Sequence, residues 1–251
     1  LLAFDQDQDA LLNRIDDSRF TLINENFRYL KRFLKFHGVM SIDGILADFG
    51  VSSHQFDVPE RGFSTRFEAN LDMRMNQQEE LSAFHVVNEY SESQLKQIFW
   101  QYGELRNAPK IARGIVSERS NGDILTSEHL KLILKKFMPP RKENKILAQI
   151  YQAIRIEVNQ EIEVLKVFLL QTPDVLKKGG RLSIISYHSL EDRLVKRFIR
   201  SGLFEGEPVK DVFGRIDVPF KKVGKLIVPN EDEIKLNNRS RSAKLRIAEK
   251  L

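Results

Sequence analysis

Two acidic residues directly follow apolar segments that are typical of strands, which suits them to accept hydrogen bonds from a ligand. Asp5 follows the apolar residues 1–4, and Asp48 follows the apolar run of residues 45–47. Ligands of open α/β sheets bind at the carboxyl ends of parallel strands, where a carboxylate can accept two O–H hydrogen bonds from a ribose. Gly50 would let the backbone approach such a ligand closely. The structural alternative for Asp48 is an ordinary strand-to-loop turn. The alternative for Asp5 is an acid that the N-terminus of the following helix stabilises.

A third strand end, at residues 186–192, carries a histidine. His188 would lie at the carboxyl edge of the sheet, where it could contact a base or accept a proton. Ser189 is the expected N-cap of the following helix, with Asp192 as a weak capping-box partner. The structural alternative for His188 is a hydrogen bond within the turn.

Basic side chains gather in two segments. The members are Arg193, Lys196, Arg197 and Arg200 at helical spacing, opposite the apolar Leu190, Leu194 and Phe198, and then Arg239, Arg241 and Lys244 near the C-terminus. Together with a net charge of +5, they favour contacts with nucleic-acid phosphates, which give affinity without reading sequence. A solvated helix face is the alternative.

Composition limits the class of protein. The 251 residues allow one large or two small domains, and 41% hydrophobic residues can form a core. The absence of cysteine excludes disulfides and cysteine-ligated zinc, and the five histidines show no metal-ligand spacing, so no metal site is predicted. No apolar run approaches the roughly 20 residues that span a bilayer. We expect a cytoplasmic protein, with further residues before Leu1 because the chain opens in what looks like a strand.

Strand and helix patterns alternate along most of the chain, which predicts a largely parallel α/β sheet. Strands are expected at 1–4, 20–23, 43–47, 181–187 and, at a sheet edge, 244–248; helices at 9–15, 27–37 and 157–170, the last closed by Thr172-Pro173. Gly179-Gly180 is predicted to be a turn. Residues 50–76 form a long polar loop, and residues 81–155 have helical periodicity throughout. A helical block inside an α/β pattern indicates an inserted subdomain.

Six segments in order resemble one protein family. They are DGILADFGVSSHQFDVPERGFS (43–64), LDMRM (71–75), YGELRNAPKIA (102–112), QAIRIEVNQE (152–161), GGRLSIISYHSLEDRLVKRF (179–198) and NNRSRSAKLRIAEK (237–250). The family is methyltransferase H, S-adenosylmethionine-dependent enzymes that modify the exocyclic N4 amine of a cytidine in small-subunit ribosomal RNA.

The resemblance implies a Rossmann-like class I methyltransferase sheet with an inserted all-helical subdomain. It places the methyltransferase domain at residues 1–78 and 156–251, and a substrate-recognition domain at 79–155. Cofactor contacts carry over to Asp5 at the ribose, Phe27 beside the adenine, and Asp48 and Gln55. The family's glycine-rich cofactor loop would precede Leu1. His54 stands where the family usually has proline, and residues 144–146 depart from its commoner His-Pro pattern.

The implied reaction is an in-line methyl transfer from a sulfonium to an amine whose lone pair is delocalised into the ring. An acceptor on the amine would localise that pair, and Asp48, His188 and Ser186 are the candidates. The target base must be splayed out or single-stranded, within an assembled or nearly assembled small subunit. Two other hypotheses remain: a non-catalytic RNA-binding or ribosome-assembly protein, and a nucleotide-dependent dehydrogenase on a similar fold.

Overall fold

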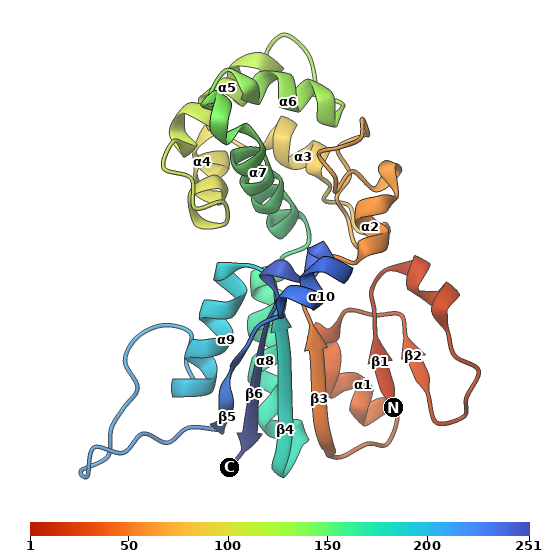
Figure 1. The fold of residues 1–251 in the computed structure, drawn as a ribbon, viewed down its shortest axis with the longest axis vertical. Helices are drawn as coiled ribbons and strands as arrows, with labels where there is room; N and C mark the ends of the chain where they lie inside the picture. Colours follow the sequence, from red (N-terminus) through yellow and green to blue (C-terminus); the bar gives the residue numbers. More distant parts are fainter. The chain divides into compact units, whose positions relative to one another are not determined.

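The computed structural model describes residues 1–251 as a mixed α/β protein of two compact units (Figure 1). The first unit comprises Leu1–Asn24 and Val51–Glu161, and the second comprises Glu25–Gly50 and Ile162–Leu251. Parallel strand pairs occur in both units. The predicted α/β class is therefore confirmed. The sheets are not largely parallel as predicted, because two of the four strand pairs are antiparallel.

The second unit contains a four-stranded sheet in the order β3-β4-β6-β5 (Figure 1). The strands are β3 (Ile42–Asp48), β4 (Leu176–Ser186), β5 (Phe220–Ile227) and β6 (Lys244–Lys250). β3 and β4 run parallel, whereas β6 is antiparallel to both β4 and β5. The predicted edge position of the last strand is wrong, because β5 pairs outside β6. β5 was not predicted, because only Phe220 among its residues is buried. Its sequence therefore lacks the alternation of apolar and polar residues that is typical of a strand.

The predicted turn at Gly179-Gly180 is also wrong, because both residues lie inside β4. Gly179 has a φ of +79°, which L side chains rarely adopt. The pairing of β3 with β4 shifts register between Ile42 and Gly44, opposite this segment. The two glycines therefore form an irregularity within the strand rather than its beginning.

The second unit also contains six helical segments. They are η2 (Phe27–Tyr29), α1 (Leu30–Phe36), α8 (Glu161–Val175), α9 (Ser189–Ser201), α10 (Glu231–Leu236) and η5 (Asn238–Ser242). α8 does not end at Thr172-Pro173 as predicted, since Pro173 lies within it. Proline cannot donate to the carbonyl four residues back, but the Thr172 hydroxyl donates to that carbonyl, on Leu169, at 2.7 Å. The helix tolerates the proline because this bond satisfies the freed acceptor.

The first unit joins a small parallel strand pair to a helical block. β1 (Leu2–Phe4) and β2 (Thr21–Ile23), both predicted as strands, pair in parallel. The segment predicted as a helix between them forms the 3-10 helix η1 (Gln8–Asn13). The remaining elements are α2 (Ser53–Asp57), η3 (Pro59–Arg61), α3 (Ala83–Glu89), α4 (Glu92–Gln101), α5 (Ala108–Arg119), α6 (Ser127–Lys135), η4 (Pro140–Lys142) and α7 (Glu143–Val158). The helical pattern predicted for residues 81–155 is confirmed at the level of secondary structure.

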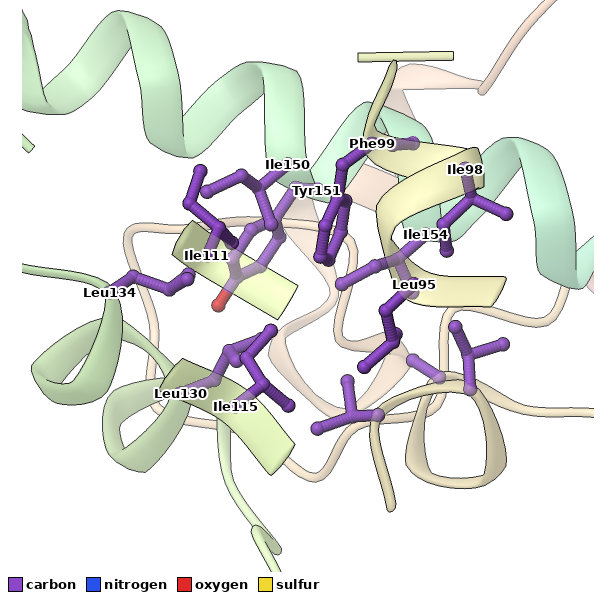
Figure 2. Close-up of a cluster of buried hydrophobic side chains, with 14 of the residues drawn as sticks. Leu95, Ile98, Phe99, Ile111, Ile115, Leu130, Leu134, Ile150, Tyr151 and Ile154 are labelled. Carbon is purple, nitrogen blue, oxygen red and sulfur yellow. The ribbon is translucent and has the colours of Figure 1, made fainter. Parts of the chain in front are cut away.

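The helices of this block enclose a continuous apolar core, part of which Figure 2 shows. Phe99, Ile111 and Ile150 are fully buried there, from α4, α5 and α7. The same core includes buried side chains from the segment before α3, namely Phe63, Leu71, Met73 and Met75. The predicted polar loop at 50–76 is therefore packed by its own apolar residues. None of the helices in the protein combines the length and apolarity needed to cross a membrane.

Candidate active site

In the first unit, Asp5 lies at the carboxyl end of β1. The Asp5 backbone N–H donates to the Ile23 carbonyl at 3.2 Å, and the Asn24 amide donates to the Asp5 carbonyl at 2.9 Å. One carboxylate oxygen accepts the Asp7 backbone N–H at 2.9 Å. Desolvation by the surrounding protein raises the pKa of Asp5, and the Asp7 charge adds to this, although the Asp7 N–H and Arg61 oppose it. The backbone is fixed, and the second carboxylate oxygen can accept hydrogen bonds from a ligand.

A buried arginine organises the residues that follow Asp5. Arg61, only 3% exposed, pairs with Asp7 at 2.9 Å and with Asp9 at 2.8 Å. It also donates to the Arg74 and Met75 carbonyls at 3.0 and 3.1 Å. Burial alone would raise the pKa of Asp7, but the hydrogen bonds from Arg61 and Gln55 outweigh it and lower the pKa. Asp7 and Arg61 were not predicted as site residues from the sequence. The acids at every second position from 5 to 9 could have indicated a cluster of negative charge that needs a basic partner.

Gln55 reaches this network through Asp7. Its amide nitrogen donates to the Asp7 carboxylate at 2.6 Å, and its amide oxygen accepts the Ser52 backbone N–H at 3.0 Å. Gln55 is also the third residue of a capping box with Ser52 at the start of α2. Asp5 and Gln55, predicted to contact the same cofactor, therefore share Asp7 as a neighbour.

In the second unit, Asp48 ends β3 and is joined to a residue that sequence reasoning did not single out. The Tyr187 hydroxyl donates to the Asp48 carboxylate, which lowers the pKa of Asp48. Desolvation is the larger effect and the Glu191 charge adds to it, so the net pKa of Asp48 is raised. Desolvation and the Asp48 charge raise the pKa of Tyr187 to about 12. Gly50 has a φ of +90°, which explains the requirement for glycine in the turn after Asp48.

The predicted capping of α9 is wrong, because His188 rather than Ser189 is the N-cap. The third residue of the helix is then Glu191, and it completes a capping box that Asp192 cannot reach. Glu191, 2% exposed, accepts the backbone N–H groups of Tyr187 at 2.9 Å and His188 at 3.3 Å. The His188 Nε2 lies 3.1 Å from the other Glu191 oxygen. The turn after β4 is thus fixed by one buried carboxylate.

Ser186 and Phe27 complete the set predicted near these strand ends. Ser186 is 1% exposed, and its hydroxyl donates to the Lys244 carbonyl at 3.5 Å, within the sheet. The half-buried Phe27 ring lies 5.7 Å from the Phe49 ring and 5.2 Å from the Phe168 ring, centroid to centroid. Phe49 follows Asp48 directly, so an aromatic cluster adjoins the end of β3.

The predicted RNA-contacting residues differ in their surroundings. Arg193 and Arg200 are exposed on α9, and Arg239 and Arg241 are exposed on η5. Arg197 donates to the Gly206 carbonyl. Lys244 lies 3.4 Å from Asp192, which also binds Arg246 at 2.7 Å. Lys244 and Arg197 therefore also serve contacts within the protein.

Acids that follow parallel strands in both units, with aromatic rings beside one of them, are typical of α/β proteins, in which ligands bind at the carboxyl ends of parallel strands. Within that class, the family model described as the MraW methylase family matches residues 1–251, and the chain belongs to this family. The family resemblance inferred from the sequence motifs is thereby confirmed.

Several relatives match the whole chain. A protein named ribosomal RNA small subunit methyltransferase H from Christiangramia forsetii is 71% identical over 251 residues, covering 100% of this chain and 83% of the relative. Proteins with the same name from Flavobacterium johnsoniae and Bacteroides fragilis are 66% and 53% identical, with the same coverage.

Proposed function

We propose that this protein transfers a methyl group from S-adenosylmethionine to the exocyclic N4 amine of a cytidine in small-subunit ribosomal RNA. The observation that supports the activity is the alignment of the whole chain with relatives named ribosomal RNA small subunit methyltransferase H, at up to 71% identity. The methyl donor and the N4 target come from the motifs that resemble the methyltransferase H family. As part of this proposal, the fold is a Rossmann-like methyltransferase sheet with an inserted helical domain at 79–155, and that domain recognises the substrate.

Each unit contains residues whose chemistry suits one part of the cofactor. Asp5 offers a carboxylate oxygen for ribose hydroxyls. The partly exposed Phe27, packed on Phe49 and Phe168, offers an apolar ring for the adenine. Gln55 can assist through the Asp7 network. When bound, the cofactor supplies an electrophilic methyl group, so the protein's task is alignment.

Asp48 is the best-supported acceptor for the substrate amine. Its carboxylate ends a strand at the sheet edge, and only its bond from Tyr187 competes for it. An ionised Asp48 would accept an N–H bond from the amine and draw electron density onto the nitrogen. The Ser186 hydroxyl, by contrast, is directed to the Lys244 carbonyl, and the His188 Nδ1 accepts the Glu191 N–H at the helix cap. Those two residues then act by shaping the turn beside the base.

Basic side chains provide the affinity for RNA by contacting its phosphates. They are Arg193, Arg197, Arg200, Arg239, Arg241 and Lys244. The substrate is rRNA within an assembled or nearly assembled subunit, which places the enzyme in the cytoplasm. The alternative of a non-catalytic assembly protein predicts subunit binding without any modified nucleoside. The dehydrogenase alternative predicts nicotinamide binding and no dependence on RNA.

Methylation of small ribosomal subunits by the full-length protein tests the proposal. Subunits are incubated with S-adenosylmethionine labelled on the methyl group, and the rRNA is digested to nucleosides. We expect labelled N4-methylcytidine with the wild type and a large loss of rate with Asp48→Asn, which keeps the size but not the charge. The exposed Asp43 at the other end of β3 gives the matched control, Asp43→Asn. Subunit binding without product would contradict the proposal.

A further inference from the structure

A groove with a basic rim lies between α9, β5 and β6, within the second unit. α9 packs against β5 and β6 (Figure 1), and the hollow between them encloses about 270 Å3. Ligand sites typically enclose roughly 300–1,000 Å3, so this groove is of a size for one small unit of a longer ligand. Its cationic rim consists of Lys196, Arg200, Lys222, Lys225 and Arg246.

Four of the five positive charges on the rim have no acidic partner. Arg246 is held by Asp192 at 2.7 Å, but the other four cations are exposed and take part in no ion pair in residues 1–251. No acidic side chain lines the groove. Four like charges around one hollow repel one another, and an anionic occupant would relieve that repulsion.

The floor is apolar. Ile199 of α9 and Phe220 of β5 line the groove between the cations. Phe220 and Lys222 lie on the same face of β5, since strand residues two positions apart share a face. An occupant must therefore combine negative charge with an apolar face. An unpaired stretch of RNA has both, because its phosphates contact Lys and Arg while its bases lie on apolar surfaces.

Arg200 and the two lysines of β5 each have a structural role that does not involve a ligand. Arg200 in the last turn of α9 interacts favourably with the helix dipole. Lysines on β5 protect the edge strand of the sheet from pairing with another chain. Neither effect requires the cations of two elements to converge on one apolar hollow.

We infer that this groove binds an unpaired segment of the substrate rRNA, with phosphates on Lys196, Arg200, Lys222 and Lys225 and a base on the apolar floor. The inference rests on the proposed function, since it names a surface by which that substrate is held. It adds the lysines of β5 to the RNA-contacting set, and these were not recognised from the sequence.

Replacement of Lys222 and Lys225 by glutamine tests the groove in the full-length protein. The matched control is Lys178→Gln with Lys221→Gln, which removes the same charge from exposed positions outside the groove. Lys221 is next to Lys222 on β5, and successive strand residues point to opposite faces. Binding of a labelled single-stranded oligocytidine RNA is measured across a salt series, beside binding of S-adenosylmethionine.

We expect the groove variant to bind RNA more weakly and to flatten the salt dependence of log K. Two lost contacts at about 0.7 each predict a slope smaller by about 1.4, while the control and the cofactor affinity stay at wild-type values. Equal slopes for the groove variant and the control would overturn the inference. Displacement of the RNA by a polyglutamate peptide, with the peptide's affinity lost in the same variant, would instead assign the groove to an acidic protein.

Kinetics with small ribosomal subunits separate this inference from the proposed function. If the groove holds substrate, the groove variant raises KM and leaves kcat near the wild-type value. If the wild type forms no methylated nucleoside, the proposed function fails whatever the salt series shows. If methylation is normal in both variants and the slopes are equal, only the groove assignment fails.

Discussion

Single carboxylates carry most of the proposed chemistry, and burial is the largest influence on the pKa of each. Asp5 is desolvated and held by the Asp7 N–H, whereas Asp48 is desolvated and bonded by Tyr187. Desolvation raises the pKa of both, so each carboxylate gains from a ligand that donates hydrogen bonds to its charged form. This shared feature makes the two strand ends suitable for hydroxyl and amine donors.

Replacement of Asp5 by alanine is expected to weaken S-adenosylmethionine binding about ten- to a hundredfold. A hydrogen bond to a charged group contributes on the order of 1.5–3 kcal/mol, which corresponds to this range of Kd. Calorimetric titration of the full-length protein measures the effect. Asp16→Ala, at an exposed acid in the same segment, serves as the control. Equal affinities in the two variants would remove Asp5 from the cofactor site.

Replacement of Tyr187 by phenylalanine is expected to slow methylation at neutral pH by about two- to twelvefold, because a typical hydrogen bond contributes about 0.5–1.5 kcal/mol. The variant also loses the bond that lowers the pKa of Asp48. The raised pKa then rises further, and the acidic limb of the pH–rate profile moves to higher pH. Tyr29→Phe, at a 41% exposed tyrosine, is the control. A lower rate with an unmoved acidic limb would show that Tyr187 acts only by packing.

At the scale of elements, ion pairs connect α9 to the sheet. Asp192 in the first turn of α9 binds Arg246 of β6 through two hydrogen bonds, at 2.7 and 3.2 Å, and both side chains are 13% exposed. Burial alone would raise the pKa of Asp192, but the bonds from Arg246 and the charges of Arg246 and Lys244 outweigh it and lower the pKa. The pair holds the helix against the middle of the sheet.

Asp192→Asn is expected to lower the free energy of unfolding by about 1.5–3 kcal/mol at neutral pH, since it removes charge-assisted bonds. The folded-state pKa of Asp192 lies below its ordinary value of 3.8. Its contribution is therefore complete above that value and is lost as the pH falls through the folded-state pKa. Urea unfolding at several pH values should show the variant and wild type converging in acid. Asp232→Asn, at an exposed pair, should change little. A difference that persists in acid would point to packing instead.

At the scale of the whole molecule, the helical block and the segment before it share one core. Phe63, Leu71, Met73 and Met75 are buried among the helices, yet they precede the proposed insertion at 79–155. A domain needs its own closed apolar core to fold alone. The proposed boundary at residue 79 therefore divides this core.

Two fragments decide that boundary. Residues 51–161 contain the whole core cluster, so we expect this fragment to unfold cooperatively in urea, as monitored by circular dichroism. Residues 79–155 lack the four earlier side chains, and each large cavity costs about 2–5 kcal/mol, so this fragment should be much less stable. Equal stability of the two would support the narrower domain. As a control, Ile150→Ala should destabilise the longer fragment, since Ile150 is fully buried.

The sequence by itself determined the features that depend on local pattern. The strands next to Asp5 and Asp48 and the amphipathic helices of residues 81–155 could be predicted, because burial imposes periods of 2 and 3.6 on apolar residues. The family motifs could be identified from their residues and their order. The acids at strand ends followed from the same patterns.

Tertiary structure decided what local pattern leaves open. β5 exists because β6 offers it a hydrogen-bonding edge, although its own residues are mostly exposed. Arg61 meets Asp7 across 54 positions of the chain, and Tyr187 meets Asp48 because parallel strands bring their carboxyl ends together. Two overlapping capping boxes were possible at α9, and the one with the buried Glu191 was formed. Contacts between distant residues depend on the packing of whole elements, and no local propensity encodes that packing.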